Sequence, residues 1–160
     1  MKPRIKILGE KKLIGVWLTM SLTENNTFDL WSNFMPRRNE IKAKLSSDLF
    51  SMQVYDASYD FKNFNTKATF KKWAAVEVAD FENVPDTMET FILESGLYAV
   101  FIHKGAASEG EKTFRFIFET WLPNSDYVLD NRPHFELLGV KYKNNDPASE
   151  EEIWIPVKLK

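Results

Sequence analysis

The stretch that decides the fold reads WLPNSDYVLDNRP at 121–133, HFELLGVKYKNN at 134–145 and EEEIWIPVK at 150–158. It predicts the end of a helix at Pro123, then a polar loop, then two apolar strands. One carboxylate, Glu136, stands inside the first apolar run, between Phe135 and Leu137. Because a charge among apolar residues is costly unless it has a partner, Glu136 is the strongest candidate for a functional residue.

The elements that precede this stretch occur twice along the chain. LIGVWLTMSL at 13–22 is followed by TFDLWSNFMP at 27–36, and LYAVFIHKGA at 97–106 is followed by FRFIFETWLP at 114–123. In each pair, a strand rich in branched and aromatic residues leads into apolar residues at helical spacing, such as Phe28, Trp31 and Met35. Ser108 and Glu111 have the spacing of a capping box at the start of the second helix.

We therefore expect one α+β domain over residues 1–160, built from two strand-helix-strand-strand units at about 1–80 and 86–160. The units would be related by a pseudo-two-fold axis and would form antiparallel sheets with the helices outside. A ligand cleft would lie between the halves, on the faces that the helices leave free. Residues 56–72 are expected to form a partly ordered connection between two strands.

Composition excludes several functions. The chain has no cysteine, which removes disulfides, thiolate metal sites and cysteine nucleophiles. Its net charge of −2 gives no basic surface for direct nucleic-acid binding. No apolar run is long enough for a signal peptide or a membrane span, so a cytoplasmic protein is expected. His134 and Glu136 share a strand face but lack a third ligand, so neither a metal nor another cofactor is expected.

The order of the elements, together with SGLYAVF at 95–101, ETWLPNSDY at 119–127, RPHFELL at 132–138 and the final EEEIWIPVK, resembles the GyrI-like effector-binding domains. The resemblance runs from about Leu13 to Lys158. It is nearest to stand-alone members related to integron-associated effector-binding proteins and to the YdeE-type proteins of bacteria. It implies a cleft for small, often cationic, aromatic or amphipathic molecules, of the kind that forms the drug-sensing part of some transcription regulators.

The resemblance also implies which residues bind the ligand. Glu136 matches the glutamate that faces the ligand's positive charge, and Tyr98 matches a pocket tyrosine. Trp154 stands where relatives more often carry a tyrosine, and Leu138 occupies a second position where a tyrosine is common. Trp73 lies in the strand of the first unit that corresponds to the strand of Trp154, so it is a further candidate for the cleft wall.

Strand alternation places Glu136 in phase with Leu138 and Val140, and Phe135 and Leu137 on the other face. We assign Phe135 and Leu137 to the face that the helix covers, which leaves Glu136 facing the cleft. In the first unit, Ser51 or Met52 stands near the matching position. The alternative interpretation of Glu136 is an edge-strand carboxylate that is solvated or paired with a lysine.

Two functions follow. In the first, the protein binds a small cation as a sensor or sequestering protein, and any effect on transcription passes through a separate regulator protein, because only twelve residues precede Leu13. In the second, some relatives resemble hydrolases of electrophilic small molecules, and Glu136 with Tyr98 would act as an acid–base pair. The two are distinguished by whether the ligand is released unchanged or converted.

Overall fold

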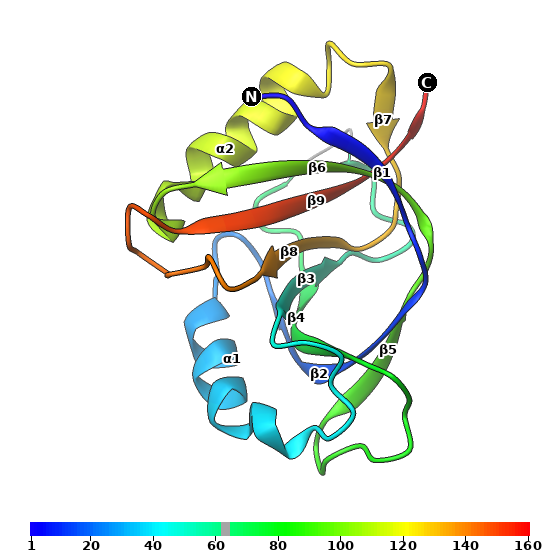
Figure 1. Cartoon of the computed structure of the whole chain (residues 1–160). Coiled ribbons are helices and arrows are strands. Elements are labelled where there is room, and N and C mark those ends of the chain that lie inside the picture. Colours follow the sequence, from blue (N-terminus) through cyan, green and yellow to red (C-terminus); the bar gives the residue numbers. More distant parts are fainter. Residues whose placement is uncertain (62–64) are drawn as a thin grey trace.

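The computed structural model describes residues 1–61 and 65–160, and it shows one curved antiparallel sheet with two helices (Figure 1). The strands run across the sheet in the order β1-β6-β9-β8-β3-β4-β2-β5, and β7 pairs with β9. Their bounds are β1 (Arg4–Leu8), β2 (Lys11–Met20), β3 (Leu49–Val54), β4 (Phe70–Val78), β5 (Glu89–Leu93), β6 (Gly96–Lys104), β7 (Tyr127–Leu129), β8 (His134–Leu138) and β9 (Glu150–Leu159).

The sheet order follows the predicted duplication. The first unit supplies β1, β2, α1, β3 and β4, and the second supplies β5, β6, α2, β8 and β9. Strands that correspond in the two units take corresponding places: β3 lies beside β8 at the centre, β4 and β9 flank them, and β2 and β6 follow. The first strand of each unit pairs with the second strand of the other unit, as β1 does with β6 and β5 with β2. The two-fold axis itself stays a prediction.

The two halves form a single sheet because β3 and β8 pair directly. Their antiparallel register places Ser51 opposite Glu136 and Met52 opposite Phe135. The two units therefore share one sheet and do not form a sheet each, whereas the ligand cleft between the halves stays a prediction. The sheet curves, and its helix-free face buries a core that both halves share. This core consists of Leu8, Leu13, Phe50, Met52, Trp73, Ala75, Leu93, Tyr98, Val100, Phe135 and Trp154.

Both helices lie on the same side of the sheet, each over its own half (Figure 1). Helix α1 (Thr27–Phe34) packs on alternate residues of β4, including Val76 and Val78. Helix α2 (Gly110–Phe116) and the segment after it pack on alternate residues of β9, including Ile153 and Ile155. The period-two pattern of β4 and β9 thus separates the helix side of the sheet from the helix-free side.

The helices differ from the predicted ones in detail. In α1, Leu30 and Phe34 are buried, whereas Phe28 is 82% exposed, so Phe28 does not belong to the buried stripe. A 3-10 helix, η1 (Met35–Glu40), follows α1 with Pro36 in its first turn. Before α2, residues Ala107–Glu109 form the 3-10 turn η3, and the helix starts without the predicted capping bond. After α2 the chain widens into a π-helical segment, η4 (Ile117–Trp121).

Candidate functional site

Glu136 lies on the helix side of the sheet. Its neighbour Phe135 is buried in the helix-free core, where its ring lies 5.2 Å from that of Trp154 and 5.3 Å from that of Phe50. Since side chains alternate along β8, Glu136 points to the opposite face, beside Ser51 of β3 and Ile153 of β9. The prediction that Phe135 and Leu137 lie under the helix, with Glu136 on the helix-free face, is therefore wrong.

Tyr98 lies on the helix-free face, with its polar group already bonded. Its hydroxyl donates a hydrogen bond of 2.8 Å to the carbonyl oxygen of Pro133, and the guanidinium of Arg132 lies 4.8 Å from its ring. Burial raises the pKa of Tyr98 to about 12. Because Tyr98 and Glu136 lie on opposite faces, the structure does not bring them together as an acid–base pair.

The two tryptophans predicted to line the cleft also lie on the helix-free face. Trp154 stacks on Phe135 and donates its indole hydrogen to Glu152 at 3.0 Å. Trp73 packs against Trp17 and Phe91. The predicted set of five residues is thus divided by the sheet: these two tryptophans and Tyr98 lie on one face, whereas Glu136 and Leu138 belong to the other. Whether any of them binds a ligand stays a prediction.

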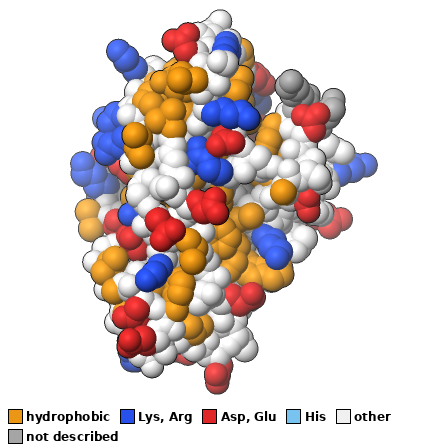
Figure 2. Space-filling model, turned by 90° about the vertical axis from the view of Figure 1, so that its right-hand side faces the viewer, with side chains coloured by type: hydrophobic (Ala, Val, Ile, Leu, Met, Phe, Trp, Pro, Cys, Tyr) orange, Lys and Arg blue, Asp and Glu red, His pale blue; other side chains and the backbone are white. Residues whose placement is uncertain are grey.

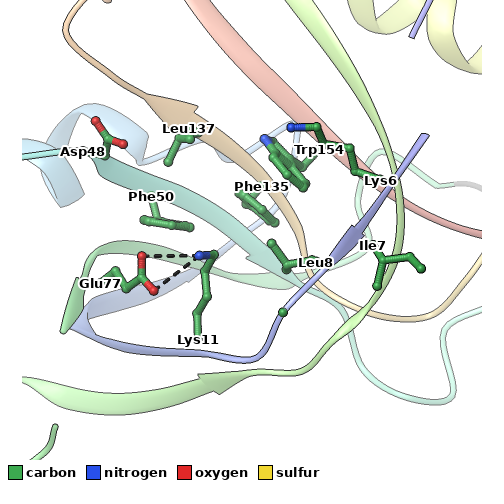
Figure 3. A pocket seen from close by; sticks show the side chains of 11 residues that line it. Lys6, Ile7, Leu8, Lys11, Asp48, Phe50, Glu77, Phe135, Leu137 and Trp154 are labelled. Carbon is green, nitrogen blue, oxygen red and sulfur yellow. Dashed lines mark hydrogen bonds and ion pairs between the residues drawn. The ribbon is translucent and has the colours of Figure 1, made fainter. Parts of the chain in front are cut away.

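The helix-free face is hollowed in two places. Figure 2 looks onto the side away from the helices and shows hydrophobic side chains along its middle, with acidic and basic groups among them. One hollow of about 300 Å³ has Phe50, Phe135 and Trp154 among its walls, and the ion pair of Lys11 with Glu77, 3.3 Å long, lies at its side (Figure 3). A second hollow, of about 320 Å³, shares Asp48 and Leu137 with the first and is lined by residues 150–152.

The helix side carries a cluster of buried charged residues around Glu136. Lys72 of β4 is only 7% exposed and Glu151 of β9 only 6%. Burial, together with the charge of Glu136 and a hydrogen bond to it, raises the pKa of Glu151 to about 9, and Lys72 opposes this shift. Glu151 is therefore protonated at neutral pH and donates a hydrogen bond to the Glu136 carboxylate. The cluster then contains two acids, of which Glu151 keeps its proton, and one lysine.

Aromatic rings surround the start of the same strand face. His134, two residues before Glu136, has the ring of Phe61 at 5.4 Å, that of Tyr55 at 5.7 Å and that of Phe118 at 6.4 Å. Burial and the charges of Lys72 and Arg132 lower the pKa of His134 to about 4, so its ring is neutral at pH 7. Within the part of the chain that the structure describes, its buried Nε2 atom has no hydrogen-bond partner.

These rings were not predicted as site residues. Tyr55 directly precedes residues 56–72, which were expected only as a connection, and Phe61 lies within them. Phe118 was expected only as part of the apolar face of a helix. Tyr55 stacks on Tyr59 at 5.0 Å, so the described start of the connection packs through aromatic rings, whereas its residues 62–64 lie outside the described residues. Phe118 belongs to the π-helical segment, a form that often occurs at functional sites. The signal in the sequence is the density of aromatic residues in a stretch that is otherwise polar.

The described residues contain neither a metal-binding cluster nor a helix that could span a membrane. Over residues 1–61 and 65–160, no group of three or more His, Asp or Glu side chains is placed to hold a metal ion. None of the helices described in that range has both the length and the apolar character to cross a membrane.

The model of the GyrI-like small molecule binding domain matches residues 1–158. The chain belongs to this family. This GyrI-like domain is 28% identical over 129 residues to the transcriptional regulator BrlR of Pseudomonas aeruginosa, a match that covers 80% of the chain but only 45% of BrlR. The relation to transcription regulators is thus a relation to part of such a protein.

Solved structures show the same fold at low identity. SAV2435, determined with bound tetraphenylphosphonium, superposes with a TM-score of 0.70 at 17% identity, over 99% of this chain and 94% of that one. The integron cassette protein VCH_CASS2 of Vibrio cholerae superposes with a TM-score of 0.68 at 14% identity, over 98% and 96% of the two chains. These structures confirm the α+β fold, and the domain model that matches residues 1–158 confirms the family.

Proposed function

We propose that this GyrI-like domain binds small amphipathic cations on the helix side of its sheet, with Glu136 as the anionic partner. It would act as a sensor or sequestering domain, and its effect on transcription would pass through a separate regulator protein. The observation that carries the proposal is a half-buried carboxylate, that of Glu136, held beside a protonated acid, Glu151, on the strand face that also carries the aromatic group of His134, Tyr55, Phe61 and Phe118.

The spacing suits a molecule with a positive centre and an apolar body. Glu136 and His134 are two residues apart on one strand, or roughly 7 Å. A cation beside Glu136 would therefore place its aromatic substituents among the rings of Phe61 and Phe118. Ring faces attract cations, and apolar burial adds to that attraction. A neutral molecule of the same shape would gain only the free energy of burying its apolar surface.

Relatives support this ligand class. The structure of SAV2435 holds tetraphenylphosphonium, a permanent cation with four aromatic rings. At 17% identity the likeness transfers the fold alone, but it makes tetraphenylphosphonium a suitable first probe. The hydrolase alternative loses its predicted acid–base pair, because the sheet separates Tyr98 from Glu136 and the Tyr98 hydroxyl already bonds to Pro133.

The test is isothermal titration calorimetry with tetraphenylphosphonium on the wild type and on Glu136→Gln. The substitution keeps the shape of the side chain and removes its charge, so we expect binding to weaken by roughly 1–3 kcal/mol, the range for hydrogen bonds to charged groups. Binding of neutral triphenylphosphine oxide should change much less. Glu77→Gln, which removes a carboxylate from the helix-free face, is the matched control and should leave the affinity unchanged.

Two results would contradict the proposal. One is equal affinity of the wild type and Glu136→Gln for the cation. The other is a loss in Glu77→Gln without a loss in Glu136→Gln, which would place the site in the hollow on the helix-free face.

A further inference from the structure

Lys72 is a cation built into the cluster of acids. In the register of the sheet, Lys72 of β4 stands opposite Gln53 of β3, and Gln53 stands opposite His134 of β8. The lysine therefore emerges on the helix side, one strand away from β8. Its long flexible stem suits a reach across β3 toward Glu136. Lys72 is 7% exposed, so most of its side chain lies inside the fold.

Within residues 1–61 and 65–160, the Lys72 ammonium makes no hydrogen bond and no ion pair within 4.0 Å. Burial lowers the pKa of Lys72, and the charge of Glu136 opposes this shift; Glu151 adds to that opposition only when it is ionised. A buried ammonium needs such compensation, since desolvation of a single charge is expensive. Glu136 therefore attracts Lys72 across a gap, without a close contact that would fix the position of the lysine.

The adjacent residue, Lys71, is also a lysine but lies in a different environment. Lys71 points to the helix-free face, where its ammonium lies 4.2 Å from the ring of Trp17. Its charge is exposed and contributes nothing to the acid cluster. Two consecutive lysines on one strand thus have different environments, and only Lys72 lies on the same face of the sheet as Glu136.

We propose that the Lys72 ammonium takes the place of the ligand's positive charge in the free domain, so that a cationic ligand must displace it. The inference rests on the proposed function, since it concerns the same site. Binding is then an exchange of cations at Glu136. Lys72 lowers the affinity for every cation and admits only those whose apolar groups also bind the aromatic rings. It is a specificity-determining residue that competes with the ligand.

The test compares tetraphenylphosphonium binding by the wild type, Lys72→Met and Lys71→Met. Methionine keeps the length of the stem and removes the charge, so Lys72→Met should bind the cation about tenfold more tightly, or better, because the competing charge is gone. Lys71→Met should bind it as the wild type does. The affinity for neutral triphenylphosphine oxide should change by much less in both variants.

The outcomes separate this inference from the proposed function. If Glu136→Gln weakens cation binding but Lys72→Met leaves it unchanged or weakens it, the competition by Lys72 is refuted and the site at Glu136 stands. If Glu136→Gln has no effect, the proposed function fails first. Urea unfolding verifies that each variant is folded. Lys72→Gln serves as a second uncharged variant and must show the same gain in affinity.

Discussion

Glu151 gives the sharpest test of the acid cluster. The side chain holds its proton in the folded state because burial and the neighbouring Glu136 raise its pKa from 4.5 to about 9. The unfolded chain releases that proton near the ordinary value. Glu151→Gln keeps a hydrogen-bond donor toward Glu136 and removes the proton that can be lost. The variant therefore isolates the free energy of keeping this acid neutral inside the fold.

The sign follows from proton binding in the two states. Between pH 4.5 and about 9, the folded protein binds one more proton at Glu151 than the unfolded chain, so its stability falls as the pH rises. The slope is up to ~1.4 kcal/mol per pH unit. From pH 6.5 to 8.5 the wild type should lose roughly 2–3 kcal/mol relative to Glu151→Gln. This window lies above the range in which His134 titrates, from 6.5 down to about 4.

The assay is urea unfolding of the wild type and Glu151→Gln at pH 6.5, 7.5 and 8.5. The control is Glu150→Gln, which changes the neighbouring acid, a half-buried partner of Lys104 at 4.0 Å and of Lys141 at 3.7 Å. Glu150→Gln should show the same pH dependence as the wild type. If the stabilities of the wild type and Glu151→Gln stay parallel over this range, Glu151 is ionised in the fold and the description of the cluster is wrong.

Two further predictions concern residues on either side of the sheet. His134 is neutral in the fold and its unfolded form gains a proton below pH 6.5, so stability should fall by up to ~1.4 kcal/mol per unit as the pH decreases from 6.5 toward 4. Urea unfolding of His134→Gln should show a smaller loss, and an equal loss would assign the effect to other groups. Tyr98→Phe removes the hydrogen bond to Pro133 and should cost about 1–2 kcal/mol of unfolding free energy without changing the affinity for tetraphenylphosphonium. A large loss of affinity in calorimetry would place Tyr98 in the ligand site.

The sequence predicts which residues of a strand share a face of the sheet, but it does not predict which of the two faces the helices cover. Alternation along β8 correctly groups Glu136 with Leu138 and separates both from Phe135 and Leu137. It does not indicate which group the helices cover, because both faces of this strand meet apolar residues: Phe135 contacts Trp154 and Phe50, and Glu136 lies beside Ile153. The choice depends on how the whole sheet curves, which no local pattern contains.

The acid cluster depends on tertiary structure for a related reason. Lys72, Glu136 and Glu151 come from β4, β8 and β9; β8 pairs directly with β9, and β3 joins β8 to β4. In the sequence, the apolar neighbours of Glu136 distinguish it, but nothing identifies Lys72 or Glu151 as its neighbours in the fold. Desolvation acts on them only after the strands have assembled, so the shifted pKa values of Lys72 and Glu151 are properties of the folded sheet.

The amino-acid sequence by itself determined the features that depend on local and repeated patterns. Apolar periodicity determined the strands and helices and their duplication, and the motifs from Ser95 to Lys158 indicated the family that the domain model confirms. Tertiary structure decided the single continuous sheet, the face of Glu136 and the rings around His134. It also decided that Phe28 is exposed to solvent, whereas Leu30 and Phe34 are buried in the core. The physical reason is that periodicity along the chain indicates which residues share a face, whereas what covers that face depends on how distant segments pack in the folded protein.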